Sequence, residues 1–347
     1  MFRMMFYNGF ESACLEKTEK SEKFQNEKEE KILSKPTKRK KAHWTKNDTE
    51  LTIMALPTTI WYILFCFLPM FGLIIAFKNY KVIGGKSFIY NLIHSEWAGV
   101  KNFMFLIKSN DLFVILRNTI LYNLVFIVLG MVVSVGLAIM ISLMRNKRAS
   151  KVYQTMMFFP YFMSWVVASY FLDAFLNQNN GLINNVLRNS GQQPIQWYMT
   201  AGAWPAILTF MYLWKSTGYN MVIYLSSISG IDTTLYEAAV MDGANKRQQV
   251  FHITLPCLKN VIIMMFILNV GKIFYSDFGL FYQLSQGASG SIFKTTATID
   301  TYIYNALRSS TIGMTSAAAF FQSVACCITI LLANAIVKKF DEDSAII

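Results

Sequence analysis

The chain has 347 residues, of which 54% are hydrophobic and 15% are charged, and its mean hydropathy is +0.36. Soluble domains have about 45–50% apolar and about 25% charged residues, so these values exclude an ordinary soluble protein. The formal net charge is +12, and twelve of the 32 basic residues and nine of the 20 acidic residues fall in the first fifty positions. Most of the other charges stand between long apolar runs. This distribution indicates a polytopic integral membrane protein.

The apolar runs predict an all-α fold with six transmembrane helices. A helix needs about 20 apolar residues to cross a hydrocarbon core of about 30 Å, and six runs reach that length. The runs are Leu51–Phe77, Asn118–Met144, Thr155–Leu176, Ala203–Gly230, Asn260–Phe281 and Gly313–Val337. Prolines at positions 57 and 69 and a glycine at position 72 predict that the first helix is bent or broken.

The distribution of charged and apolar residues divides the chain into three parts. We expect a charged tail at residues 1–50, a membrane domain at residues 51–340 and a short tail at residues 341–347.

The distribution of basic residues also predicts the orientation of the chain. If the N-terminus is cytosolic, sixteen Lys and Arg residues lie close to the membrane on the inner side and nine on the outer side. Cytoplasmic loops carry the excess of basic residues, so both termini are expected in the cytosol. The first tail mixes Glu with Lys, which argues against nucleic acid. Its basic run from Lys38 to Lys41 favours contact with anionic lipid of the inner leaflet.

The sequence contains no recognisable catalytic or metal-binding motif. Its three histidines are isolated from one another and from acidic residues, and the motifs His-Glu-x-x-His, Cys-x-x-Cys and Gly-x-Ser-x-Gly are absent. The polar residues within the apolar runs form no evident pair of nucleophile and base. An intramembrane enzyme is therefore disfavoured, and we expect no catalytic residue, no metal site and no cofactor bound by this chain.

The polar segment between the fourth and fifth runs, residues 231–256, is the most informative part of the sequence. Leu235 and Val240 lie among small and acidic residues in a pattern that predicts a short amphipathic helix. Gly243 can adopt a left-handed conformation and end that helix. A second short helix is expected from Asn245, and Pro256 is expected to stand at the start of the next transmembrane helix. Such a segment could dock a cytosolic partner, although a simple connecting loop is nearly as consistent with the pattern.

This segment resembles the EAA signature of permease subunits of binding-protein-dependent ABC importers. The Asp-Gly-Ala variant is similar to the carbohydrate-uptake branch, and further stretches between Leu51 and Phe340 resemble LplB-like oligosaccharide permeases. The matching residues are Glu237, Ala238, Ala239, Asp242, Gly243, Ala244, Phe251, Ile253, Leu255 and Pro256.

The resemblance implies the MetI-like fold of type I importer permeases in a bacterial plasma membrane. It also implies a second homologous permease subunit, two cytosolic ABC ATPase subunits that bind ATP and Mg²⁺, and an extracellular sugar-binding protein or lipoprotein. The residues from Glu237 to Ala244 would then couple the permease to the ATPases. The resemblance favours oligosaccharide uptake. A permease for another polar solute, such as a glycerol phosphate, and a stand-alone channel or carrier remain alternatives.

Several polar residues within the apolar runs are candidates for the substrate path. A charge near the bilayer centre costs about 2.5–3.5 kcal/mol on insertion scales, so Lys215 and Lys272 should face a cavity, a partner or a helix end. They would either line the sugar path, which would suit an anionic uronate-bearing oligosaccharide, or bind backbone carbonyls, Asp277 or the partner subunit. The candidates are Lys215, Tyr219, Asn220, Asn269, Lys272 and Gln322.

Overall fold

The computed structural model describes residues 46–108, 111–288, 290–309 and 311–340. Most of the charged tail expected at residues 1–50, and the whole of that at residues 341–347, lie outside these ranges. The chain divides after Pro69 into two compact units, and each is described by itself. The α-helices are α2 (Lys46–Tyr62), α3 (Phe88–His94), α4 (Lys101–Lys108), α5 (Leu112–Ser142), α6 (Lys147–Phe158), α7 (Trp165–Leu176), α8 (Leu182–Asn189), α9 (Trp204–Ser229), α10 (Thr233–Met241), α11 (Lys246–Gln249), α12 (Leu255–Val270), α13 (Phe293–Thr296), α14 (Ile299–Ser309) and α15 (Ile312–Phe340).

Shorter elements connect or interrupt these helices. Strands β1 (Lys78–Asn79) and β2 (Glu96–Trp97) form an antiparallel pair. The π-helical segments are η1 (Ile63–Phe67), η6 (Val250–Thr254) and η7 (Gly279–Gln283), and the 3₁₀ segments are η2 (Leu68–Phe77), η3 (Phe159–Phe162), η4 (Trp197–Met199), η5 (Ala201–Ala203) and η8 (Gly290–Ile292).

The first unit contains α2 and η1. Pro57 lies inside α2, and the helix continues through the π-helical segment η1 into the 3₁₀ segment η2. The expected bend or break thus takes the form of a change in helix type, and Lys46–Phe77 still qualifies as a single apolar helix of 32 residues.

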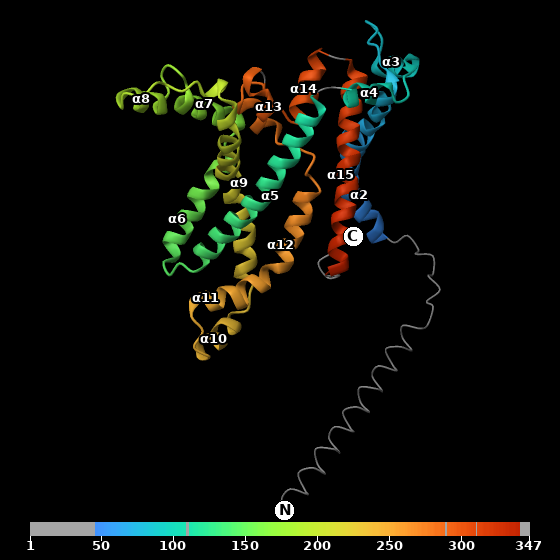
Figure 1. Cartoon of the computed structure of the whole chain (residues 1–347). Coiled ribbons are helices and arrows are strands. Elements are labelled where there is room, and N and C mark those ends of the chain that lie inside the picture. Colours follow the sequence, from blue (N-terminus) through green and yellow to red (C-terminus); the bar gives the residue numbers. More distant parts are fainter. Residues whose placement is uncertain (1–45, 109–110, 289, 310, 341–347) are drawn as a thin grey trace, which may run out of the picture. The chain divides into compact units, whose positions relative to one another are not determined.

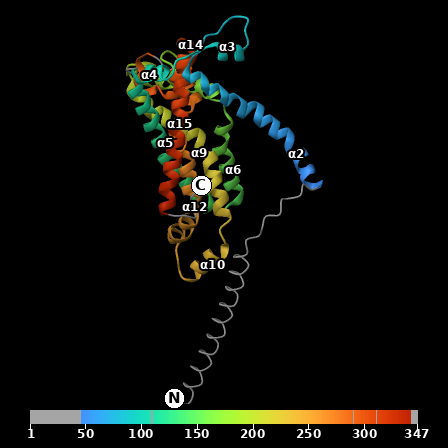
Figure 2. The same cartoon turned by 90° about the vertical axis from the view of Figure 1, so that its right-hand side faces the viewer.

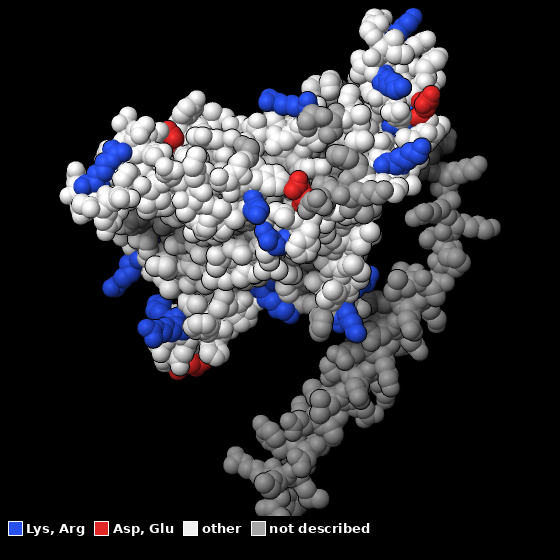
Figure 3. All heavy atoms as spheres, turned by 45° about the horizontal axis from the view of Figure 1, so that its top comes forward, with Lys and Arg blue, Asp and Glu red and all other residues white. Residues whose placement is uncertain are grey.

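In the second unit, α5, α9 and α12 pack against one another, and α15 packs against α12 (Figure 1). The short helices α10 and α11 lie at one end of this group, whereas α4, α13 and α14 lie at the other (Figure 1, and Figure 2 for α4, α10 and α14). The helix α15 runs from the end near α14 towards the end where α10 lies. Figure 3 shows a mostly uncharged surface on which Lys and Arg are more frequent than Asp and Glu.

The pair α5 and α9 forms the centre of this unit. Small residues Gly130, Ser134 and Ala138 recur every four positions along α5 and allow the backbone of α9 to approach closely. The Phe126 ring of α5 stacks on the Tyr212 ring of α9, with the ring centroids 4.0 Å apart. The opposite face of α5 exposes large apolar side chains, as expected for a face in contact with lipid. Examples are Leu121, Leu124, Val128 and Val132.

The helix α6 packs on another side of α9, and a glycine makes this contact possible. A Cβ atom added to Gly218 would lie 1.9 Å from the backbone oxygen of Met157 and 2.5 Å from its carbonyl carbon. These atoms belong to the backbone of α6 and cannot move aside as a flexible side chain could. Any larger residue at position 218 must therefore push α6 and α9 apart.

The described residues contain four helices that are long and apolar enough to cross a membrane, or five if a bent pair counts as one span. The four correspond to the predicted first, second, fifth and sixth runs. The predicted third run is not a continuous helix, because Lys147–Phe162 and Trp165–Leu176 meet at 99°. The fourth run forms α9, whose 26 residues extend about 39 Å at 1.5 Å per residue.

The prediction for the fifth run was wrong at both ends. Its helix ends at Val270 rather than Phe281, and residues 271–277 form turns and irregular backbone. At the other end, α11, η6 and α12 form one continuous helix, Lys246–Val270. The second short helix therefore runs directly into the span, and the π-helical segment η6 precedes Pro256, which cannot donate a backbone hydrogen bond.

The contact between α6 and α9 yields a prediction. Gly218→Ala should destabilise the protein by about 1–3 kcal/mol, because the added methyl group overlaps backbone atoms. Gly136→Ala is the matched control, since an added Cβ there has no atom within 4 Å, and it should leave stability unchanged or raise it by about 0.4–1 kcal/mol. Thermal unfolding of the detergent-solubilised variants measures both effects. Equal unfolding temperatures for the two variants would contradict this account of the packing.

Candidate coupling segment and substrate path

The helix α10 begins and ends at defined capping residues. The Asp232 side chain accepts a hydrogen bond from the backbone N–H of Thr234 at 3.0 Å, which caps the first turn and lowers the pKa of the Asp232 carboxyl. At the other end, Gly243 has φ of 81°. The Gly243 N–H donates to the Val240 carbonyl at 3.0 Å, and the Ala244 N–H donates to the Ala239 carbonyl at 2.8 Å. This pair of bonds is a Schellman motif, so the structure confirms Gly243 as the helix terminator.

The segment after the turn is fixed to α10. Asn245 caps α11 in a capping box with Gln248. The buried Gln249 side chain donates to the Ala244 carbonyl at 3.1 Å. The hydroxyl groups of Tyr236 on α10 and Thr254 on η6 lie 2.9 Å apart and form a hydrogen bond. The short helix is therefore attached to the base of the long helix Lys246–Val270.

The outer face of α10 is open to solvent. None of its residues is buried, and Leu235, Val240 and Met241 have exposed fractions of 48%, 55% and 87%. Among the predicted coupling residues, Glu237, Ala238, Asp242 and Gly243 are exposed, and Ala239 and Ala244 are partly buried. Exposed apolar residues beside a carboxylate form a surface suited to contact with another protein.

Lys215 on α9 binds the backbone at the bend between η3 and α7. Its Nζ donates to the carbonyl oxygens of Tyr161 at 2.8 Å and Met163 at 2.5 Å. These carbonyls lie where the helix is interrupted, and backbone groups in hydrocarbon must be satisfied within the protein. The Nζ also lies 5.2 Å from the centroid of the Trp165 ring, and the Trp165 Nε1 donates to Asp277 at 2.7 Å.

The irregular backbone after α12 is satisfied in a similar way. Asn123 on α5 donates to the carbonyls of Ile273 at 3.0 Å and Tyr275 at 2.8 Å. Gln322 on α15 is buried and donates to the Phe274 carbonyl at 2.8 Å. Gln322 also donates to Asp300 at 3.1 Å. Side chains from two spans thus hold consecutive carbonyls of the broken segment.

The other path candidates lie in two places. Asn220 and Asn269 line the same small pocket of about 10 Å³ between α5, α9 and α12, a volume close to that of one water molecule. Tyr219 stacks on Tyr161 with centroids 4.6 Å apart, and both rings are about two-fifths exposed. Lys272 lies in the turn beyond α12 rather than at mid-helix, and is exposed. Within the described residues, its ammonium group makes no hydrogen bond.

Sequence reasoning missed Asn123, Tyr161, Trp165 and Asp300. Asn123 is a polar residue within an apolar run, and that signal alone marks it as a residue with a partner inside the bundle. The other three lie next to helix interruptions whose positions were not predicted. Their importance therefore became visible only with the fold.

The sequence from residue 130 to residue 342 matches the family model described as "Binding-protein-dependent transport system inner membrane component". The chain belongs to this family. It is therefore a permease subunit, and the EAA resemblance noted in α10 is consistent with this assignment. The family consists of inner membrane components, which agrees with several apolar helices in one chain.

Individual relatives extend the match beyond the family model. The permease is 31% identical to the polygalacturonan/rhamnogalacturonan transport system permease protein YteP of Bacillus subtilis strain 168, over 92% of this chain and 94% of YteP. It is 28% identical to the protein LplB of the same organism, over 86% of this chain and 91% of LplB. These similarities confirm the resemblance to the carbohydrate-uptake branch.

A solved structure shows the same fold. The permease matches a chain in the crystal structure of a bacterial ABC transporter involved in the import of the acidic polysaccharide alginate. The TM-score is 0.75 with 28% identity, over 85% of this chain and 97% of that chain. A second crystal structure shows a bacterial alginate ABC transporter in complex with an alginate pentasaccharide-bound periplasmic protein. The all-helical MetI-like fold is thus established for this permease.

The contacts of Lys215 yield a prediction. Lys215→Met should destabilise the permease by about 1–3 kcal/mol, because two carbonyls at the helix bend lose their donor. Lys272→Met removes the same charge from a position without such hydrogen bonds and should change stability by less than about 0.5 kcal/mol. Thermal unfolding in detergent compares the two. A loss of stability for Lys272→Met as large as that for Lys215→Met would contradict the structural role of Lys215.

Proposed function

We propose that this permease forms one half of the translocation pathway of an ATP-driven importer for acidic oligosaccharides. The observation that carries the proposal is the geometry of α10. It is a capped helix with an exposed apolar face, fixed at the base of a long helix, in a chain whose family transports solutes with a binding protein.

The proposed topology has six spans. Four are the long apolar helices, the fifth is the bent pair α6 and α7, and the sixth is α9. The helix α9 is long enough to cross a membrane, although Lys215, Ser216 and Asn220 make it more polar than the others. Both termini would be cytosolic, on the side of α10, in the bacterial plasma membrane. The excess of basic residues on that side supports this orientation.

The proposed assembly contains a second, homologous permease, two cytosolic ATPase subunits and an extracellular sugar-binding protein. The crystal structure of the alginate transporter with its pentasaccharide-bound periplasmic protein supports the last of these partners. The ATPase subunits would bind ATP and Mg²⁺ and carry out hydrolysis, and this chain would supply no catalytic residue.

Coupling would depend on the rigid attachment of α10. When ATP brings the two ATPases together, the docked α10 moves with its ATPase. The hydrogen bond between Tyr236 and Thr254 and the Gln249 contact transmit this displacement to the helix Lys246–Val270. Nucleotide thus shifts the population between inward-open and outward-open states through contacts that differ in the two states.

The cargo is proposed to be an oligosaccharide that carries carboxylates. YteP is named for polygalacturonan and rhamnogalacturonan, and the structural relative imports alginate, which is an acidic polysaccharide. In this chain, the exposed Lys272 provides a cation that makes no hydrogen bond within the described residues. The stacked rings of Tyr161 and Tyr219 offer an exposed aromatic surface to a sugar ring.

The coupling residues can be tested with a double variant. Glu237→Lys combined with Gly243→Asp should abolish uptake while the protein still inserts, because it reverses a charge at the proposed docking surface and strains a left-handed turn by about 1–2 kcal/mol. Lys339→Glu, a charge reversal in the last turn of α15, is the control. The measurements are ATP hydrolysis stimulated by the loaded binding protein, and uptake into proteoliposomes. Wild-type uptake by the double variant would contradict the proposed coupling.

The acidic cargo can be tested by competition between charged and neutral substrates. Proteoliposomes with the complete importer should take up uronate oligosaccharides faster than neutral ones of equal length. Lys272→Met should slow uronate uptake about tenfold, equivalent to about 1.4 kcal/mol, and leave neutral uptake unchanged. Lys338→Met, at the end of α15, serves as the matched control. Equal rates for both substrates, with no effect of Lys272→Met, would contradict an acidic cargo.

A further inference from the structure

A cavity with apolar and basic lining residues lies beside the coupling segment, away from the proposed sugar path. It has a volume of about 590 Å³ and is bounded by the end of α5, the first turns of α6, the end of α9, and the segment from α10 to η6. Known small-molecule sites have volumes of about 300–1,000 Å³. The cavity is therefore large enough for a ligand rather than only for water.

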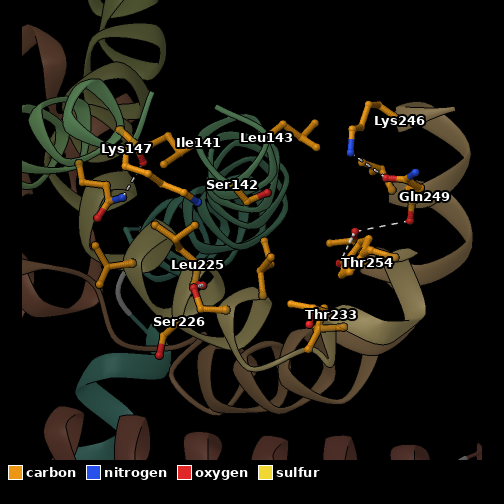
Figure 4. Close-up of a pocket in the computed structure, with 18 of the residues that line it drawn as sticks. Ile141, Ser142, Leu143, Lys147, Leu225, Ser226, Thr233, Lys246, Gln249 and Thr254 are labelled. Atoms are coloured by element: carbon orange, nitrogen blue, oxygen red, sulfur yellow. Dashed lines mark hydrogen bonds between the residues drawn. The ribbon is translucent and has the colours of Figure 1, made fainter. Parts of the chain in front are cut away.

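The charges around this cavity have one sign. Lys147 and Lys151 on α6 and Lys246 on α11 line it, and none of the described residues that line it is acidic. Lys246 donates to Gln249 at 3.1 Å, whereas Lys147 and Lys151 have no carboxylate partner within the described residues. In Figure 4, Lys147 and Lys246 lie on opposite sides of the cavity. Like charges gathered around one space repel each other unless an anion occupies it.

The uncharged lining groups suit the same kind of ligand. Among the hydroxyl groups that line the cavity, those of Ser142 on α5 and Ser229 on α9 donate to the carbonyls of Ile139 and Leu225 and can only accept from a ligand. Those of Ser226 on α9 and Thr233 on α10 make no hydrogen bond within the described residues. Hydroxyl groups can donate to phosphate oxygens, and ammonium groups provide the charge that attracts them. Together, three cations and the two hydroxyl groups of Ser226 and Thr233 around one space favour an anion with several oxygens.

We propose that this cavity binds a phosphate-bearing anion, either the headgroup of an anionic phospholipid or a soluble phosphate ester. Such a ligand would contact α6, α9 and the segment after α10 at the same time. It would therefore stabilise the position of the coupling segment relative to these two helices. The choice of a lipid headgroup as the ligand rests on the proposed function, because the proposed topology places α10 on the cytosolic side of the membrane. Basic pockets between transmembrane helices on that side bind anionic lipid headgroups.

The test measures binding to the complete purified importer rather than transport. One probe is phosphatidylglycerol, compared with phosphatidylcholine of the same acyl chains by native mass spectrometry. The other is sn-glycerol 1-phosphate, measured by titration calorimetry. Because neither measurement needs uptake, the result does not depend on whether the importer carries acidic sugars.

Two kinds of variant distinguish binding inside the cavity from binding to basic residues elsewhere on the surface. Lys147→Gln, Lys151→Gln and Lys246→Gln together should weaken binding at least about tenfold, since each lysine near a membrane surface contributes about 1 kcal/mol. Arg148→Gln and Arg247→Gln together are the matched control, because these residues are neighbours of the lysines but do not line the cavity. Ser229→Phe keeps every charge and narrows the space, so it should weaken binding as well.

The outcomes are distinct. Phosphatidylglycerol binding that is lost in the lysine and Ser229→Phe variants, but kept in the arginine variant, supports the site with a lipid source. The same dependence for sn-glycerol 1-phosphate alone supports a soluble source. If neither probe binds, or if binding is equal in the lysine and arginine variants or unaffected by Ser229→Phe, the inference is overturned.

Discussion

The need to satisfy backbone carbonyls at interrupted helices governs the architecture of the second unit. Water is absent from the hydrocarbon core, so each unpaired carbonyl there costs several kcal/mol. The chain interrupts one span before α7 and continues as irregular backbone after α12, and in both places donors come from other helices. Lys215 supplies the first, and Asn123 and Gln322 supply the second. These bonds fix α5, α9 and α15 relative to the interruptions.

This constraint also distinguishes the lysines from one another. Lys215 is engaged with backbone, so its position follows from the bend that it stabilises. Lys272 is exposed in the turn after α12, without such bonds in the described residues. Lys147, Lys151 and Lys246 surround a cavity at the opposite end of the unit. The five lysines carry the same charge but lie in three different environments: the bend before α7, the turn after α12 and the cavity beside α10.

The sequence predicted those features that depend on local interactions. The short helix α10, its end at Gly243 and the start of the next helix near Asn245 were predicted, because capping and left-handed turns involve residues within one or two turns of each other. The existence of four apolar spans was also predicted, three of them with nearly correct bounds, since burial in lipid demands long apolar stretches.

The features that were not predicted depend on contacts between distant residues. The run Asn260–Phe281 is apolar throughout most of its length, so hydropathy could not reveal that its helix ends at Val270. That end is stable because Asn123 and Gln322, from two other spans, bind the carbonyls that follow. Likewise, the bend near Met163 depends on Lys215, some fifty positions later. No local pattern specifies such pairs, and the role of the path candidates depends on them.

The central claim is that α10 transmits the motion of an ATPase subunit to the permease, and a photo-crosslinking residue at Met241 tests it most directly. This side chain is 87% exposed at the end of α10. In the assembled importer, irradiation should join the permease to an ATPase subunit, with a yield that changes when ATP is added. If no such product forms, or if position 241 reacts with a membrane-impermeant reagent from outside intact cells, the account is contradicted.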